Sequence, residues 1–366
     1  MEASFWKDKK VVITGAAGFI GSHLTQKLLK EGALVVGIVR GDLKSSILEL
    51  HGLGQITNQE NFILENNNLL DAAFLEVIFD KHKPDTVFHL AASAIVSEAA
   101  KNPSPTISSN VVGTLNILEA SRLAGVKRVL IASSDKTYGD HSLDPSQPLP
   151  FKEDYSLRGL DIYSASKTCA DMLAQAYAFQ YKMPVAILRS CNVFGPGDTN
   201  VTRLIPKTIL RLMTGKKPQI KLGHEKVLRE YIYIDDVLEA YLVMAQKVEN
   251  YYGEEGQNIP VKGSEPFGWP AFNVGSYTAE QTKDLGTCEN IQNVSNVISL
   301  LAEKINGLQP EVVEKNPEYI EIPDEYSDSS KILNLGFVPK VGFKQGIDKT
   351  IAWYKEHFAD LKNLEV

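Results

Sequence analysis

The chain has 366 residues, of which 43% are hydrophobic and 23% charged, and its formal net charge is −7. These values are typical of a soluble globular protein of about two domains, and they exclude disordered, collagen-like and coiled-coil chains. The acidic balance argues against nucleic acid as the main partner, since binding a phosphate backbone needs a basic surface. Cys169, Cys191 and Cys288 have no metal-like spacing, so we expect free thiols in a reducing compartment and no metal site. No apolar run is long enough to span a membrane, and Met1–Lys10 lacks the apolar core of a signal peptide, which predicts a cytoplasmic protein without a membrane partner.

The first half of the chain alternates short apolar runs with helical patterns. The predicted strands are Lys10–Thr14, Ala33–Val39, Thr86–Leu90, Arg128–Ala132 and Val185–Arg189, and the predicted helices include Gly21–Gly32, Val111–Ala124 and Ser164–Tyr181. Near-continuous apolar strands separated by helices are typical of a parallel sheet covered on both faces. The pattern therefore predicts an α/β fold with a doubly wound parallel sheet of the Rossmann type.

The rhythm changes after Gly195-Pro196-Gly197 to mixed helices, short strands and loops rich in Gly and Pro. We predict a cofactor-binding domain at 1–191, with a returning segment near 229–248, and a smaller α/β substrate domain at 192–366. Further expectations are short strands at Arg229–Asp235 and Ala271–Gly275, an irregular insertion at Tyr251–Pro270 and an amphipathic helix at Phe343–Phe358.

Gly15, Gly18 and Gly21 follow the first predicted strand and open a helix. Glycines at this place allow a tight turn and a close approach of the backbone to a pyrophosphate, whose charge the helix N-terminus favours. The alternative is a tight turn with no ligand. The position between a strand and a helix favours dinucleotide binding.

The end of the second predicted strand bears on the choice between NAD and NADP. A carboxylate there bonds the adenine ribose, whereas an arginine accommodates a 2′-phosphate. The strand ends in Arg40, which favours NADP. In the alternative, Arg40 is a solvated residue and Asp42 binds the ribose of NAD.

Tyr163 and Lys167 are four residues apart and therefore share one face of a predicted helix. A phenol has a pKa near 10, and a neighbouring ammonium together with an oxidised nicotinamide would lower it towards neutrality. The phenolate could then take a proton from a sugar hydroxyl during hydride transfer. The alternative for such a pair is an ordinary exposed helix face.

Several motifs together resemble the extended short-chain dehydrogenase/reductases that act on nucleotide sugars, over nearly the whole chain. They are Thr14–Gly21, His89–Ala92, Asn110–Thr114, the pair Tyr163 and Lys167, Arg229–Asp236 and Phe272–Gly275. The resemblance implies NAD or NADP bound tightly by the N-terminal domain, a nucleoside-diphosphate sugar bound by the C-terminal domain, and a homodimer formed by helices near Val111–Ala124 and Ser164–Tyr181.

The resemblance also implies roles for individual residues. The expected cofactor-binding residues are Gly15, Gly18, Phe19, Ile20, Gly21, Arg40, Asn68, Leu69, Leu90, Ala91, Ala92, Asn110, Tyr163 and Lys167. The expected substrate-binding residues are Ser93, Ser134, Asn192, Arg203, Leu204 and Arg229, with Ser134 on the sugar O4 and with Asn192 and Arg229 on the diphosphate. For Arg229 the alternative is a surface salt bridge with Glu230.

Ser134, Asp135 and Lys136 follow the fourth predicted strand and separate two branches of the family. Epimerases need only oxidise and reduce C4, whereas 4,6-dehydratases must also remove the C5 proton and protonate the departing O6. Asp135 and Lys136 can both transfer protons, and the Ser-Asp-Lys motif resembles that of CDP-glucose 4,6-dehydratases. The motif departs from that of the dTDP-glucose dehydratases, whose third residue is a glutamate.

A lysine base must be neutral, so the pKa of Lys136 would have to fall. The alternative for Asp135 and Lys136 is a loop ion pair.

We therefore expect a nucleotide-sugar 4,6-dehydratase whose catalytic residues are Ser134, Asp135, Lys136, Tyr163 and Lys167. A 4-epimerase or C4 oxidoreductase is the alternative, and a non-catalytic NADP-sensing protein of the same fold is a third class. The end of the second strand at Arg40 resembles GDP-mannose dehydratases, so the nucleotide base stays open.

Overall fold

The computed structural model describes residues 4–41, 60–251, 269–314, 322–362 and 364. Asp42 and almost all of the insertion expected at Tyr251–Pro270 lie outside these residues. None of the helices in the described part of the chain combines the length and the apolar character that crossing a membrane requires.

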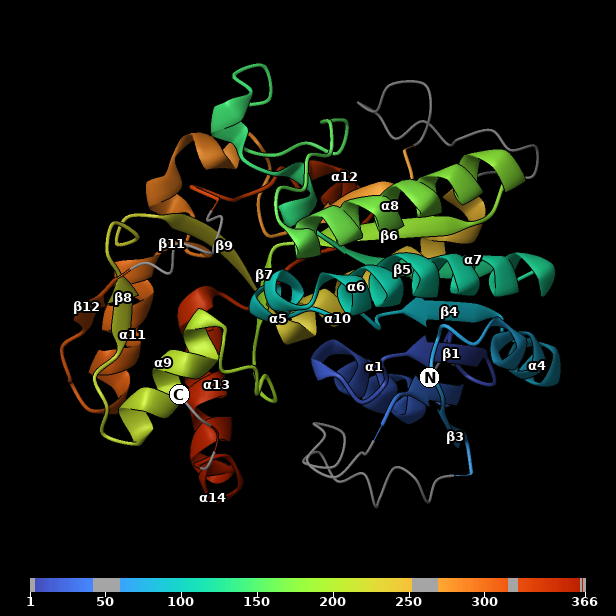
Figure 1. The fold of residues 1–366 in the computed structure, drawn as a ribbon, viewed down its shortest axis with the longest axis horizontal. Helices are drawn as coiled ribbons and strands as arrows, with labels where there is room; N and C mark the ends of the chain where they lie inside the picture. The colour runs from blue at the N-terminus through green and yellow to red at the C-terminus, as the bar shows by residue number, and fades with distance from the viewer. Residues whose placement is uncertain (1–3, 42–59, 252–268, 315–321, 363, 365–366) are drawn as a thin grey trace.

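The largest element is a seven-stranded parallel sheet in the order β3-β2-β1-β4-β5-β6-β10 (Figure 1). Its strands are β1 (Lys10–Thr14), β2 (Leu34–Val39), β3 (Phe62–Asn66), β4 (Thr86–His89), β5 (Arg128–Ser134), β6 (Val185–Ser190) and β10 (Ala271–Val274). This order has the doubly wound Rossmann pattern, so the expected fold class is confirmed. Five of the strands were predicted in nearly the same places. β3 was not predicted, and the strand expected at Ala271–Gly275 joins the edge of this sheet.

Helices cover both faces of the sheet. The N-terminal part contains α1 (Phe19–Lys30), α4 (Ala72–His82), α5 (Val96–Lys101), α6 (Pro103–Ile107), α7 (Gly113–Leu123) and α8 (Ile162–Tyr181). α1 and α10 (Ile234–Tyr251) pack on one face, while α4, α7 and α8 pack on the other. Alternate strand residues join the two cores: Val11 and Ile13 face α1 and α10, and Val12 faces α4 and α7. Burial of both faces explains why the strand sequences are apolar throughout.

Most of the elements that complete the chain gather at the left of Figure 1, whereas α12 (Ser330–Asn334) lies beside β10 at the edge of the large sheet. Together these elements are β7 (Asn192–Phe194), β8 (Gln219–Lys221), β9 (Leu228–Tyr233), β11 (Ile291–Asn293), β12 (Glu311–Val313), α9 (Leu204–Met213), α11 (Val294–Ile305), α12, α13 (Phe343–Glu356) and α14 (Phe358–Leu361). β11, β9 and β7 form a small mixed sheet, and β12 pairs with β8. Apolar residues of α9, α11 and α13 belong to the same core as those of α1, so the large sheet and this part share one hydrophobic core. The predicted C-terminal helix is confirmed as α13.

Candidate active site

The turn between β1 and α1 has the geometry that a bound pyrophosphate needs. Gly15 has a φ of +70°, and a Cβ there would lie 2.9 Å from the backbone of Ala91. A Cβ on Gly21 would lie 2.1 Å from the carbonyl oxygen of Gly15. Gly18 is the N-cap residue of α1, and Phe19 and Ile20 lie in the first turn, where N–H groups have no partner within the helix. Gly15 and Gly21 are therefore packed too closely against neighbouring backbone to carry a side chain, which is the tight packing expected of a dinucleotide-binding turn.

The loop after β4 lies directly beside this turn. The N–H of Leu90 donates to the Thr14 carbonyl oxygen at 3.2 Å, and the N–H of Ala91 donates to Thr14 Oγ1 at 3.2 Å. His89 joins Thr14 Oγ1 at 2.8 Å and Thr114 Oγ1 at 2.9 Å through its two ring nitrogens. Burial, with a smaller effect of the Lys167 charge, lowers the pKa of His89 to about 3. The neutral His89 ring therefore links β1, β4 and α7 immediately before Leu90, Ala91 and Ala92 in the chain.

Asn110 sits in a π-helical turn, Ser108–Val112, that leads into α7. Its Oδ1 accepts from the Ser93 N–H at 2.7 Å, and its Nδ2 donates to the Ser93 carbonyl at 3.1 Å and to Ser166 Oγ at 2.9 Å. All of its hydrogen-bonding groups are therefore used within the protein. This geometry fastens the loop after β4 to α8, and Ser93, expected to touch substrate, lies on that loop. π-helical turns occur frequently at functional sites.

The remaining expected cofactor residues lie at the carboxyl ends of β2 and β3. Arg40 is exposed and follows the last residue of β2 directly. The side chain of the β3 residue Asn66 bonds the N–H and the carbonyl of Gly41, which fixes the chain just after Arg40. Asn68 and Leu69 follow β3, and the Leu69 carbonyl accepts from Asn116 Nδ2 at 2.9 Å.

Tyr163 and Lys167 lie on the first two turns of α8. Asp161 caps this helix by accepting from the Ser164 N–H at 3.0 Å, which sets the position of Tyr163. Lys167 is buried, and its Nζ donates to the carbonyl oxygen of Ala132 in β5. Burial, partly offset by the charge of Asp171, lowers the pKa of Lys167 to about 8.

The pKa of Tyr163 is raised by burial, and this rise is opposed by the positive charges of Arg203 and Lys136. The sequence predicted that Lys167 would lower this pKa, but in the structure the opposing cations are Arg203 and Lys136. The expected lowering of the Tyr163 pKa also depended on a bound oxidised nicotinamide. Tyr163, Lys136 and Arg203 come from α8, the turn after β5 and the residue before α9, and the two cations are near enough to Tyr163 to affect its pKa.

A buried network that the sequence did not predict holds α8 against the sheet. Arg189 in β6 donates from Nε and one terminal nitrogen to the two oxygens of Asp171, each at 2.9 Å. Ser133 Oγ in β5 donates to Asp171 Oδ2 at 2.7 Å. Asp171 lies one turn beyond Lys167, so this bidentate ion pair fixes the helix that carries the catalytic pair. The sequence did offer one signal for Asp171, because it lies four residues after Lys167 and therefore on the same face of the helix.

Ser134, Asp135 and Lys136 stand where β5 ends and a short 3₁₀ helix, Asp135–Tyr138, begins. Ser134 Oγ donates to Asp135 Oδ1 at 3.0 Å and accepts from the Lys136 N–H at 3.3 Å. The change from strand to helix is what lets these consecutive side chains turn towards one site. Burial, with a further contribution from the charge of Glu325, raises the pKa of Asp135 to about 7.

Lys136 is paired with Glu325, a residue that the sequence analysis did not identify. The Lys136 Nζ lies 2.9 Å from Glu325 Oε2, and the Lys136 side chain is 26% exposed whereas that of Glu325 is fully buried. Burial alone would lower the pKa of Lys136, but Glu325 and Asp135 outweigh it and the pKa is raised. The fall in pKa that a lysine base requires is therefore not found, because two carboxylates stabilise the ammonium. The alternative of an Asp135–Lys136 loop pair is also incomplete, since the hydrogen-bonded partner is Glu325.

Arg229 is buried in β9, and its Nε lies 3.0 Å from Glu325 Oε2. It also donates to the carbonyl oxygens of Leu228, Pro323 and Ile322. The alternative of a surface salt bridge with Glu230 is wrong, because Glu230 accepts instead from the backbone N–H groups of Ser276 and Ser327. The role of Arg229 in diphosphate binding stays a prediction.

The other expected substrate residues lie around β7 and α9. Asn192 Nδ2 donates to the Glu230 carbonyl at 3.1 Å. Arg203 immediately precedes α9, donates to Asp198 Oδ1 at 2.9 Å and keeps 40% of its side chain exposed, and Leu204 is the first residue of that helix. Arg203 thus remains accessible beside Tyr163.

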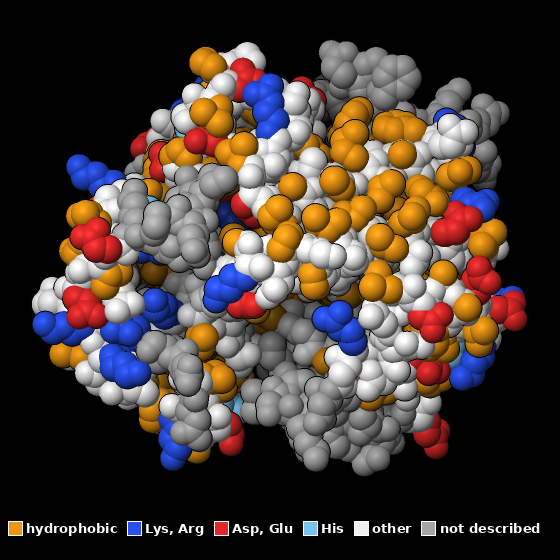
Figure 2. Space-filling model, viewed as in Figure 1, with side chains coloured by type: hydrophobic (Ala, Val, Ile, Leu, Met, Phe, Trp, Pro, Cys, Tyr) orange, Lys and Arg blue, Asp and Glu red, His pale blue; other side chains and the backbone are white. Residues whose placement is uncertain are grey.

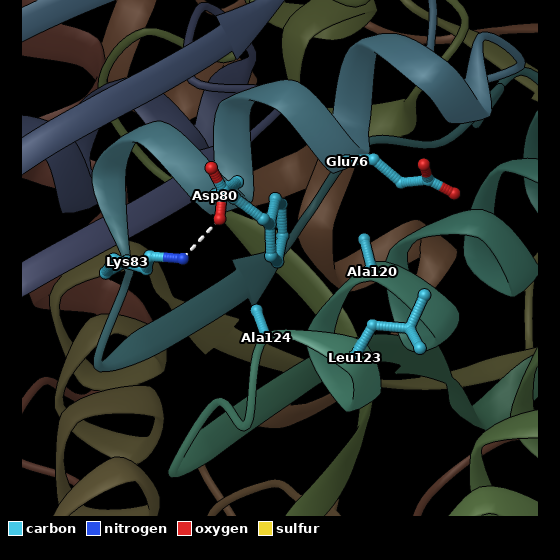
Figure 3. Close-up of a pocket in the computed structure, with 7 residues that line it drawn as sticks. Glu76, Asp80, Lys83, Ala120, Leu123 and Ala124 are labelled. Carbon is cyan, nitrogen blue, oxygen red and sulfur yellow. Dashed lines mark hydrogen bonds and ion pairs between the residues drawn. The ribbon is translucent and has the colours of Figure 1, made fainter.

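A cavity of about 230 Å³ lies elsewhere, between α4 and α7 (Figure 3). It is lined by Glu76, Phe79, Asp80, Lys83, Ala120, Leu123 and Ala124, and Lys83 pairs with Asp80 at its rim. These residues lie at or near the C-terminal ends of α4 and α7, whereas Ser134 lies at the carboxyl end of β5. Ligands of open α/β sheets bind at the carboxyl ends of the strands, so this cavity is separate from the candidate site.

The glycine turn after β1, together with Tyr163 and Lys167 on α8, is the arrangement of an extended short-chain dehydrogenase/reductase. The family model described as GDP-mannose 4,6 dehydratase matches residues 12–350. The chain belongs to that family. It is also 30% identical to human dTDP-D-glucose 4,6-dehydratase over 381 aligned positions, which cover 100% of this chain and 98% of the human one.

Two solved structures illustrate the range of the fold. The UDP-glucose 4-epimerase of Thermotoga maritima with UDP-glucose superimposes with a TM-score of 0.76 at 27% identity, covering 95% of this chain and 99% of that one. The dTDP-glucose 4,6-dehydratase of Bacillus anthracis in complex with NAD has a TM-score of 0.77 at 22% identity, covering 98% and 100%. Both branches considered from the sequence are therefore represented among the structural neighbours.

Proposed function

We propose that the protein is a nucleotide-sugar 4,6-dehydratase that converts an NDP-hexose to an NDP-4-keto-6-deoxy sugar. The observation that carries the proposal is Asp135, a buried carboxyl group beside Ser134 whose pKa is raised to about 7. A carboxylic acid that keeps its proton near neutral pH can protonate a departing hydroxyl. The family and the human relative support the same reaction.

The residues divide the chemistry between them. Tyr163 takes the proton of the sugar O4 hydroxyl, and Ser134 bonds the same oxygen. Asp135 gives its proton to O6, which leaves as water, and the C5 proton leaves towards Lys136. A nicotinamide cofactor on the glycine turn would accept a hydride from C4 and return it to C6. Lys167, held against Ala132, positions α8 and places a positive charge near the cofactor site.

The cofactor is proposed to be NADP, because Arg40 is exposed at the end of β2, where a 2′-phosphate would lie. NAD is the alternative, and the Bacillus anthracis neighbour contains NAD.

We further propose that the protein is a homodimer through α7 and α8. Large apolar side chains are exposed on these helices, namely Leu115, Leu123, Met172, Phe179 and Tyr181. Figure 2 shows hydrophobic side chains gathered over this region. Apolar patches of this kind commonly mark an interface between proteins. The thiols of Cys169, Cys191 and Cys288 are unpaired, which suits the proposed location in the reducing cytoplasm.

The epimerase remains the second candidate, because the Thermotoga maritima neighbour is a UDP-glucose 4-epimerase. Incubation with dTDP-glucose, CDP-glucose, UDP-glucose and GDP-mannose, followed by mass spectrometry, separates the two. A dehydratase yields a product lighter by one water, whereas an epimerase yields an isomer of unchanged mass that must be separated from the substrate by chromatography before detection.

A further inference from the structure

Glu325 reaches the candidate site from a part of the chain that is 189 residues away from Lys136. The segment that carries it runs beside β9, with a bridge between Arg229 and Glu325, and beside Phe151, with a bridge between Phe151 and Ser327. The N–H of Glu325 donates to the Leu228 carbonyl at 3.1 Å, and its carbonyl accepts from the Glu230 N–H at 3.0 Å. The backbone of Glu325 is therefore fixed on both sides.

The side chain of Glu325 is arranged asymmetrically. Oε2 receives both cations, Lys136 at 2.9 Å and Arg229 at 3.0 Å. Oε1 is buried and has no hydrogen-bond partner among the described residues, and the same holds for Oδ2 of Asp135. A buried polar atom without a partner is costly, so an atom of this kind is expected where a proton or a ligand is bound.

The charge of Glu325 affects the protonation of Asp135. The charge of Glu325 contributes to the raised pKa of Asp135, while the charges of Lys136 and Arg229 hold the pKa of Glu325 below its usual value despite burial. Neighbouring carboxyl groups commonly share one proton. The Lys136 side chain is partly exposed, whereas those of Glu325 and Asp135 are buried.

Resting on the proposed dehydratase function, we propose that Glu325 is a positioning residue that accepts the proton Lys136 must release before it can take one from C5. The Lys136 ammonium passes a proton to the Glu325 carboxylate, and the resulting amine takes the C5 proton as the C5–H electron pair becomes part of the enolate. Asp135 gives its proton to O6 as the C6–O6 bond breaks and water leaves. The Glu325 carboxyl group then returns a proton to Asp135, so the base and the acid of the elimination are connected.

Lys136 is held in its charged form but must be neutral to act as a base. A lysine faced by Asp135 and Glu325, with Tyr163 and Arg229 also nearby, is held as an ammonium and is not a base by itself. The carboxylate that stabilises the ammonium also lies 2.9 Å from Nζ, so the proton can pass to Glu325 Oε2 without movement of either residue. The glutamate that dTDP-glucose dehydratases carry at the position of Lys136 is thus matched here by a glutamate from another segment.

The test uses Glu325→Gln and Glu325→Asp in the full-length chain with its cofactor and with whichever of the four nucleotide sugars the wild type dehydrates. Gln keeps the size and the hydrogen bonds of Glu325 but cannot accept a proton. We expect C5 exchange with D₂O to fall about 10²-fold in Glu325→Gln near neutral pH, a usual loss for an acid–base group, and Glu325→Asp to retain most of the exchange. Single-turnover oxidation of C4, seen as the absorbance of reduced nicotinamide, should stay within about threefold of wild type.

The pH dependence distinguishes a proton acceptor from a structural role. Without the negative charge of Glu325 the pKa of Lys136 falls, so the neutral amine forms at lower pH than in the wild type. The exchange rate of Glu325→Gln should therefore recover as the pH rises, and its pH profile should differ from that of the wild type by about one unit or more. Asp348→Asn is the matched control, since it removes a carboxylate paired with Lys304 at 2.6 Å and should leave the profile unchanged. A Gln variant that exchanges at the wild-type rate, or one that loses C4 oxidation and exchange equally at every pH, would overturn the proposal.

Two further measurements keep the outcomes separate. If Glu325→Gln does not fold, Lys136→Met is compared with the double variant Lys136→Met/Glu325→Gln, in which both opposite charges are removed. A relay through Lys136 predicts no further loss of C5 exchange in the double variant, and an additional large loss would contradict it. If the wild type releases water from none of the four sugars, the dehydratase function itself fails, whereas an active wild type with an unaffected Gln variant rejects only the role of Glu325.

Discussion

Oγ of Ser134 donates a hydrogen bond to Oδ1 of Asp135 at 3.0 Å, so the residue expected on the sugar O4 is coupled to the proposed acid for O6. This hydrogen bond favours the charged form of Asp135 and opposes the effect of burial on its pKa. The oxidation and elimination parts of the reaction therefore share one hydrogen-bonded pair at the end of β5.

The first prediction concerns pH. Asp135 can protonate O6 only while it carries its proton, and its pKa is raised to about 7, so water loss should slow as the pH rises through about 7. Removing the hydrogen bond in Ser134→Ala should raise this pKa further and move the alkaline limb to higher pH, even though C4 oxidation also slows. The measurement is single-turnover water loss, normalised to C4 oxidation, across the pH range. An alkaline limb at the same pH in both proteins would show that Asp135 is not the acid.

Tyr163→Phe should abolish turnover and leave cofactor binding nearly intact, because it removes only the phenol oxygen expected beside the sugar O4. Loss of a positioned acid–base group typically costs about 10² to 10⁴ in rate. Tyr177→Phe is the control, since it removes a phenol of the same helix whose hydroxyl donates to Glu119 at 3.1 Å. Activity of Tyr163→Phe within tenfold of the wild type would reject the assignment.

Arg40→Ala should weaken NADP binding about 10- to 100-fold and change NAD binding little, because a hydrogen bond to a charged group contributes about 1.5–3 kcal/mol. Calorimetric titration with each cofactor measures the difference. Lys83→Ala is the control. It removes a different exposed cation, which is paired with Asp80, and should change neither the NADP nor the NAD affinity. Equal effects of Arg40→Ala on both cofactors, or a preference of the wild type for NAD, would show that Arg40 is only a surface residue.

Met172→Glu tests the proposed dimer. Met172 lies on α8 with 52% of its surface exposed, and burying a charge in an apolar interface without a partner is costly. We expect the wild type to have the mass of a dimer in light scattering and the variant to have that of a monomer. Val312→Glu, in β12 at a position that is 60% exposed, should remain dimeric. A monomeric wild type would reject the interface.

Local patterns were sufficient for most of the large sheet. Val11 to Thr14 and the glycines that follow specify a buried strand and a tight turn through interactions close in sequence, and both are found as expected. β3 was missed because Phe62–Asn66 mixes apolar and polar residues and lies at the edge of the described sheet. Tyr163 and Lys167 were found because one helix carries both.

Long-range relationships could not be obtained in the same way. Glu325 reaches Lys136 because its segment is bridged to Arg229 in β9. The two residues are 189 positions apart, and no spacing pattern in the sequence predicts a contact over that separation. For the same reason the carboxylates that raise the pKa of Lys136 were not foreseen, and the alternative considered for Arg229, a salt bridge with Glu230, named the wrong carboxylate. Electrostatic properties of a site depend on all the groups around it, including those from distant segments.

The central claim is most directly tested by running the reaction in D₂O and locating deuterium and oxygen in the product by NMR. If the protein is a 4,6-dehydratase, one of the four nucleotide sugars should yield a 4-keto-6-deoxy product with solvent deuterium at C5 and the former C4 hydrogen at C6. A product that keeps its O6 hydroxyl and carries no deuterium at C5 would contradict the account and identify a 4-epimerase, in which Asp135 and Lys136 only bind the sugar.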